Sequence, residues 1–259
     1  MKRRFHSKLV WALVWAIANS FLIHSFLNPS PALAQSTVSP GLVQRVMNLF
    51  NPPRNRNSGA AAGRQFAGAG RDLCPPTSTP LTALVPSTNL GLTLDANPTL
   101  WFYIPYAAPQ GYETEFVLID AEENDVYKQN FALPEEPGVI SIQIPEQVAL
   151  EAGDSYRWVI SVMCNPENRS GDATVNGWIQ RVDSENLDDQ LAAATLENKM
   201  LLYSENDLWY ELLTTLAELR RDQFNNAEIE AAWKEFLIAA GFSEAVASAP
   251  LNFCCTASD

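Results

Sequence analysis

Short apolar runs separated by turn-forming residues fill the chain from residue 81 to residue 182. Two of these runs, residues 156–164 and 174–182, flank the polar loop 165–172, and this pattern predicts a β-hairpin in the middle of a sheet. Isoleucines at positions 140, 142 and 144 alternate with polar residues, as in a half-buried antiparallel strand. About seven or eight such strands indicate an antiparallel β-sandwich of the immunoglobulin or fibronectin type III kind.

After residue 182 the spacing of apolar residues becomes helical. The acidic stretch 183–189 predicts the start of a helix that runs to Leu202, because acids suit a helix N-terminus. A second helix is expected over residues 207–222, and a third is expected to be capped by Asn225. The buried face of the second helix is predicted from leucines at positions 208, 212, 216 and 219. The fold class expected is therefore mainly β, with about three C-terminal α-helices packed on the sandwich.

The first 34 residues have the features of an export signal. Basic residues at positions 2, 3, 4 and 8 precede an apolar core over residues 9–27, and Ala32-Leu33-Ala34 fits a cleavage site. The competing interpretation is a retained membrane anchor, but polar residues at positions 19, 20, 24 and 25 interrupt the core and favour cleavage. We expect an exported protein in the periplasm or outside the cell, with no stable membrane anchor after cleavage.

Residues 35–80 predict a disordered linker rich in Pro, Gly, Ala and Arg, because such a composition buries too little apolar area to offset chain entropy. One segment within it, residues 42–50, places Leu42, Val46, Met47 and Phe50 on one helical face. That segment is expected to dock on the body, on a partner or on a membrane surface, or to form only a transient turn. The expected domain boundaries are 81–182 for the sandwich, 183–250 for the helical part and 251–259 for a flexible tail.

Composition excludes several classes of site and partner. The only histidines, His6 and His24, lie in the predicted signal, so the mature chain cannot form a Ser-His-Asp, Cys-His or His-containing zinc site. We therefore expect no metal and no cofactor. From Asp72 onward there are 8 basic and 30 acidic residues, a net charge of 8 − 30 = −22, which argues against nucleic acid and anionic membranes as partners.

Four cysteines stand at positions 74, 164, 254 and 255, and in an oxidising compartment an even number suggests disulfides. Four cysteines allow three pairings. The pairing Cys74–Cys164 is favoured, because it would pin the end of the linker to the central hairpin and because adjacent cysteines seldom pair with each other. Cys254 and Cys255 could then pair with a partner chain or be an idiosyncrasy of this sequence.

Two groups of residues are candidate ligand sites, neither of them catalytic. Arg169 and Asp172 lie in the polar loop beside the predicted disulfide, and sandwich loops often bind ligands, although the two side chains could instead pair and fix the turn. Trp158 and Trp178 could form an exposed platform for a sugar, with neighbouring arginines in cation–π contact, or could be ordinary core residues.

A carboxylate-dependent hydrolase needs two acids across a cleft. Glu113, Glu115 and Asp120 are available for this role. Glu113 and Glu115 are only two residues apart on one predicted strand, which is too close in sequence to straddle a substrate by themselves. No catalytic residue is assigned.

Several sequence strings occur in a specific order. They are LTALVP at 81–86, PTLWFYIPY at 98–106, EFVLID at 115–120, YRW at 156–158, RSGD at 169–172, GWIQRV at 177–182 and WYELLTTLAELR at 209–220. Together they resemble the cyanobacterial domain-of-unknown-function family 928, and the likeness runs from about residue 73 to residue 250. The resemblance implies a cyanobacterial origin, an exported domain and no established activity. It also implies one cysteine before the first strand and one at the hairpin loop, which supports the Cys74–Cys164 pairing.

From these features we expect a non-enzymatic extracytoplasmic binding or adaptor domain whose partner is another envelope protein. One alternative is a carbohydrate-binding module that uses Trp158 and Trp178. The other is a carboxylate-dependent glycoside hydrolase.

Overall fold

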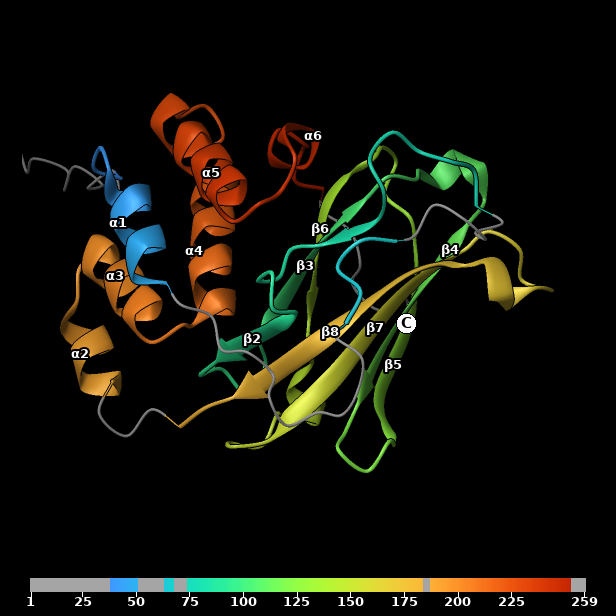
Figure 1. Ribbon diagram of the computed structural model, residues 1–259, viewed down its shortest axis with the longest axis horizontal. Helices are drawn as coiled ribbons and strands as arrows, with labels where there is room; N and C mark the ends of the chain where they lie inside the picture. The colour runs from blue at the N-terminus through green and yellow to red at the C-terminus, as the bar shows by residue number, and fades with distance from the viewer. Residues whose placement is uncertain (1–37, 51–62, 68–73, 184–186, 253–259) are drawn as a thin grey trace, which may run out of the picture. The chain divides into compact units, whose positions relative to one another are not determined.

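Two β-sheets form the centre of the computed structural model, which describes residues 38–50, 63–67, 74–183 and 187–252 (Figure 1). The smaller sheet has the order β1 (Thr82–Ala83), β3 (Thr99–Ile104) and β6 (Gly138–Gln143). The larger sheet has the order β2 (Leu90–Thr93), β8 (Ala173–Arg181), β7 (Ser155–Met163), β4 (Glu113–Ile119) and β5 (Asp125–Ala132). The prediction of a β-rich chain with several helices is therefore confirmed in this coarser form.

One strand pair differs from the predicted antiparallel arrangement. The strand β2 runs parallel to β8, with Leu90 opposite Trp178 and Thr93 opposite Arg181. The other pairs in both sheets are antiparallel, so the larger sheet is mixed. Sequence patterns do not specify the direction of pairing, because an edge strand of four residues carries the same alternation in either direction.

The predicted central hairpin is the β7–β8 pair, and its observed bounds differ from the expected ones by a single residue. Trp158 on β7 is fully buried and lies 5.5 Å from the ring of Phe102 on β3, which joins the two sheets through the core. Gly177 faces Trp158 across the pair, and a Cβ atom on Gly177 would lie 2.3 Å from Trp158 Cζ2. A glycine is therefore required where the indole crosses the neighbouring strand.

Five helices follow the last strand among the described residues, instead of about three. They are α2 (Asp188–Ala193), α3 (Leu196–Glu205), α4 (Trp209–Asp222), α5 (Ala227–Ala239) and α6 (Glu244–Ala247). The single helix predicted to reach Leu202 is broken because Thr195 caps α3 by accepting the N–H of Asn198. The cap of α5 is Asn226 rather than the predicted Asn225, and its side chain accepts the N–H groups of Glu228 and Ile229.

A further helix, α1 (Leu42–Leu49), lies in the segment predicted as a disordered linker. It packs on α3 and α5. Figure 1 shows it among the helices that lie beside β2, the edge strand of the larger sheet. Leu42, Val43 and Val46 are buried, and Ser204 of α3 donates a hydrogen bond to the carbonyl of Val46. Of the alternatives expected for this segment, docking on the body is the one observed.

Residues 63–67 also belong to the folded body, since Arg64 bridges to Asn176 and Phe66 bridges to Thr82. The prediction of a disordered linker is therefore wrong for residues 38–50 and 63–67. The predicted export signal, most of the C-terminal tail and Cys254 and Cys255 lie outside the described residues. Within the described part of the chain, no helix combines the length and the apolar character that crossing a bilayer requires.

Candidate functional site

The loop predicted as a ligand site is held by ion pairs. Arg169 donates from Nη2 to Glu115 Oε1 at 2.9 Å and from Nε to Asp172 Oδ2 at 2.5 Å, and Lys128 Nζ lies 2.6 Å from Glu115 Oε2. Burial would raise the pKa of Glu115, but hydrogen bonds from Arg169 and Lys128 outweigh it and hold that pKa below its ordinary value. Arg169 and Asp172 therefore pair with each other and fix the loop to β4 and β5, as the structural alternative predicted.

The two tryptophans of the predicted sugar platform lie on different sides of the larger sheet. Trp158 is fully buried in the core, so the expectation that it forms part of an exposed platform is wrong. Trp178 is half-buried and lies opposite Arg157 in the strand pairing. Trp158 is paired with Gly177, and Trp178 is the next residue of β8. Because successive residues of a strand point to opposite faces, Trp178 lies on the other face of the sheet from Trp158.

The Cys74–Cys164 disulfide is confirmed, with an S–S distance of 2.07 Å and a Cα–Cα distance of 5.1 Å. It joins the segment before β1 to the end of β7, and 90 residues separate the two cysteines.

Two of the three acids considered for hydrolysis have local structural roles. Glu115 belongs to the ion pairs described above. Asp120 accepts hydrogen bonds from Asn124 and from the N–H of Glu122 in the β4–β5 turn, and these bonds lower its pKa. Glu113 is exposed on the same face of β4 as Glu115.

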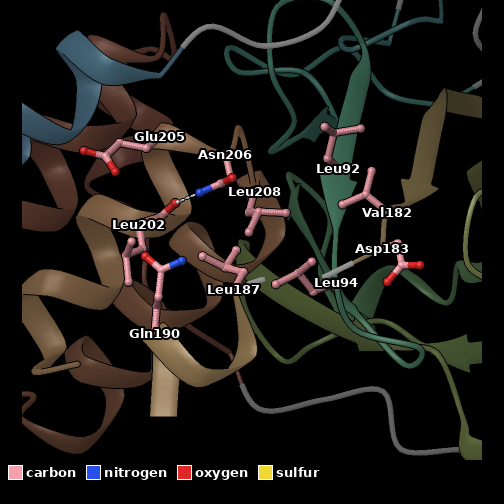
Figure 2. A pocket seen from close by; sticks show the side chains of 10 residues that line it. All are labelled: Leu92, Leu94, Val182, Asp183, Leu187, Gln190, Leu202, Glu205, Asn206 and Leu208. Carbon is pink, nitrogen blue, oxygen red and sulfur yellow. Dashed lines mark hydrogen bonds between the residues drawn. The ribbon is translucent and has the colours of Figure 1, made fainter. Parts of the chain in front are cut away.

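A groove of about 680 Å³ lies between the ends of β2 and β8 and the helices α2 and α3 (Figure 2). We call it the leucine groove. Six aliphatic residues line it, and four polar residues complete its walls. The aliphatic residues are Leu92, Leu94, Val182, Leu187, Leu202 and Leu208, and the polar ones are Asp183, Gln190, Glu205 and Asn206.

Figure 2 shows leucine side chains from the strand and from the helices facing one another across this groove. Leu92 and Leu94 are half-buried, whereas Thr93 between them is buried. This alternation means that β2 presents leucines to the groove and Thr93 to its opposite side. The groove was not predicted from the sequence, because its two walls come from segments about a hundred residues apart.

A second cavity of about 160 Å³, which we call the Glu211 pocket, lies between α4 and the residues around β2 and the start of β3. Its lining residues are Thr93, Asp95, Pro98, Thr99, Tyr203, Tyr210, Glu211, Thr214 and Thr215. Glu211 Oε1 accepts hydrogen bonds from Thr93 Oγ1 at 2.8 Å, from the N–H of Leu94 at 2.6 Å and from the N–H of Asp95 at 3.4 Å. The other oxygen, Oε2, is buried and has no hydrogen-bond partner among the described residues.

Burial raises the pKa of Glu211, and the hydrogen bonds from Leu94 and Thr93 offset only part of this effect. Burial and the charge of Glu211 raise the pKa of Tyr203. Glu211 was not identified from the sequence. An acid in the first turn of a helix is favoured by the helix dipole, so its presence there gives no sign of a buried site. One signal was present, since Glu211 falls three residues after Leu208 and so lies near the buried face of α4.

The family model described as Domain of Unknown Function (DUF928) matches residues 62–251. The chain belongs to the DUF928 family. The matched range contains the eight strands that the structure describes and the helices α2–α6, and α1 precedes it. No curated protein and no solved structure is significantly similar to the chain.

Both cavities lie within the DUF928 match. The described residues contain no group of three His, Cys, Asp or Glu side chains that could hold a metal ion. The leucine groove offers apolar and polar surface in about equal shares, and the Glu211 pocket offers a carboxyl group with an oxygen that has no hydrogen-bond partner among the described residues. Binding is therefore the chemistry that these two sites support most directly.

Proposed function

We propose that this DUF928 protein is an exported, non-enzymatic binding domain that holds a segment of another envelope protein in the leucine groove. The observation that carries the proposal is the set of six aliphatic side chains that line an open groove of about 680 Å³. Apolar surface of this kind at a concave site favours binding, because covering it removes the surface from water.

The charge around the groove indicates the chemistry of the partner. Asp183 and Glu205 stand among its walls, and no Lys or Arg of the described residues lines it. The chain from Asp72 onward has 30 acidic and 8 basic residues, so its field attracts cationic segments. We therefore propose an occupant with two or three aliphatic side chains flanked by lysine or arginine.

The aliphatic anchors of such an occupant supply enough energy for weak, reversible binding. Each aliphatic side chain that becomes fully buried contributes about 1.5–3 kcal/mol. Two or three anchors then contribute several kcal/mol, from which the loss of translational and rotational freedom must be subtracted. A net gain of about 4 kcal/mol or less corresponds to a dissociation constant on the order of millimolar, so the aliphatic anchors alone give weak and readily reversible binding.

Site-specific photocrosslinking in native envelopes tests the proposal. Benzoylphenylalanine in place of Leu202 should form a discrete adduct with one partner, while the same group in place of Asn130, on the opposite edge strand β5, should not. The variant Leu94→Asp should abolish the adduct, whereas the exposed Asn130→Asp should leave it intact. A synthetic peptide from the crosslinked segment should bind the protein and not Leu94→Asp, and equal adducts at both positions would contradict the proposal.

Export is supported by the basic and apolar N-terminal pattern and by the Cys74–Cys164 disulfide, because disulfides persist in oxidising compartments. For the fold, we propose a variant of the immunoglobulin or fibronectin type III sandwich in which β2 has joined the larger sheet in parallel. The contact of Phe102 and Trp158 between the two sheets supports this relation.

A carbohydrate-binding role remains a second proposal, and the half-buried Trp178 on the outer face of the larger sheet favours it. Cell-wall polysaccharide should then change the tryptophan fluorescence of the wild type and not that of Trp178→Leu. An identical response of the two proteins would contradict a role for this residue.

A further inference from the structure

Glu211 on α4 has an asymmetric set of partners. Its Oε1 atom accepts hydrogen bonds from Thr93, Leu94 and Asp95, which join α4 to the end of β2. Its Oε2 atom is out of contact with solvent and receives no hydrogen bond from the described residues. A buried carboxyl oxygen without a donor is costly, so the arrangement favours a ligand that supplies one.

The walls of the Glu211 pocket select for a cationic donor. They contain a second carboxyl group, that of Asp95, and the part of the chain that the structure describes places no lysine, arginine or histidine among them. Thr99 and Thr215 add hydroxyl groups, which can accept hydrogen bonds, and Tyr203 adds an aromatic ring. Asp95 is exposed, so the pocket reaches the surface beside it.

The size of the pocket limits the ligand to a small group. A volume of about 160 Å³ corresponds to roughly five water molecules at ~30 Å³ each. That is enough for an ammonium group on a short alkyl chain. An ammonium group has three N–H donors and no acceptor, so it can serve one carboxyl oxygen and two hydroxyl oxygens at once.

We propose that the Glu211 pocket binds a primary ammonium group, with the carboxylate of Glu211 as its anionic acceptor. The group can come from a small free amine or from a lysine side chain of a bound protein. The site does not depend on the leucine groove, because Thr93 faces away from the groove and Glu211 does not line it.

Titration with n-butylammonium chloride, followed by the backbone amide NMR signals of the protein, tests the proposal. The amides of Leu94 and Asp95 donate to Glu211, so their signals should shift on addition of the amine. The neutral alcohol n-butanol, of similar size, should leave them unchanged. Addition of Nα-acetyl-lysine methylamide should reproduce the shifts if the pocket accepts lysine side chains, whereas a response to n-butylammonium alone identifies a free amine as the source.

The variant Glu211→Gln should raise the dissociation constant of n-butylammonium by about tenfold or more, the effect expected for a hydrogen bond to a charged group. The matched control Glu218→Gln removes the same charge from an exposed position of α4 and should leave the dissociation constant unchanged. If Glu211→Gln fails to fold, Thr215→Val removes one wall hydroxyl and should weaken binding several-fold. The proposal is overturned if n-butylammonium shifts neither amide, if n-butanol shifts them equally, or if binding survives in the folded variants.

Discussion

The helix α1 provides the sharpest test of the fold, because two of its leucines differ in burial. Leu42 is 1% exposed and packs in the core, whereas Leu49 on the same helix is 42% exposed. Replacing a buried leucine by alanine costs about 2.7–5 kcal/mol through lost burial and the cavity that remains. The same replacement at a largely solvated position costs under about 1 kcal/mol. The intrinsic helix propensity changes equally in both variants, so the difference between them reports packing.

Leu42→Ala should therefore lower the free energy of unfolding by about 2–4 kcal/mol more than Leu49→Ala. Urea titration followed by tryptophan fluorescence measures this difference, and Trp209, which lies 5.3 Å from Phe50 at the end of α1, is a reporter close to the change. The slope of the free energy against urea concentration should stay the same in both variants. A difference below about 1 kcal/mol would show that α1 does not unfold with the body, and the packing argument would then fail.

Two further predictions concern the disulfide and Glu211. The double variant Cys74→Ser and Cys164→Ser should lose about 4–5 kcal/mol of unfolding free energy in urea titration, because the bridge spans 90 residues of sequence, and a loss below about 1 kcal/mol would contradict this. Burial raises the pKa of Glu211 in the folded state, so the protonated carboxyl group contributes to the free energy of unfolding. This contribution is fully present below pH 4.5, the ordinary pKa, and is lost as the pH rises through the raised pKa. The unfolding free energy of the wild type should therefore fall relative to that of Glu211→Gln between pH 4.5 and the raised pKa, and an equal pH dependence of the two proteins would count against a raised pKa.

The strands with clean patterns were predictable from the sequence. Alternating isoleucines located β6, and the β-branched and aromatic runs located β7 and β8 to within one residue, because burial on one face imposes a period of two. The parallel partner of β8 was not predictable, since β2 has only four residues and each of them pairs with a residue 88 positions later in the chain. Pairing direction depends on tertiary packing that local pattern does not encode.

Composition was a poor guide to the segment before the first strand. Its many Pro, Gly and Arg residues predict disorder on average, yet Leu42, Val43 and Val46 supply enough buried area to hold one short helix against α3 and α5. The average over the segment conceals these three positions. The burial of the two tryptophans was also not predictable from composition. Trp158 and Trp178 have the same side chain, and the strand register alone decides that Trp158 is buried in the core.

The two proposed sites share one short wall, and this explains why neither has a sequence motif. A Cβ atom added to Gly91 of β2 would lie 2.5 Å from the ring of Tyr210. The glycine therefore allows α4 to pack closely on this strand. Leu92 and Leu94 then face the leucine groove, and Thr93 faces Glu211. The opposite walls come from α2, α3 and α4, and Thr93 and Glu211 are 118 residues apart in the chain. A site built from alternate residues at an edge strand and from distant helices has no fixed spacing in the sequence. It is recognised from the carboxyl oxygen without a partner and from the half-buried leucines Leu92, Leu94 and Leu202, once the strand and the helices are brought together.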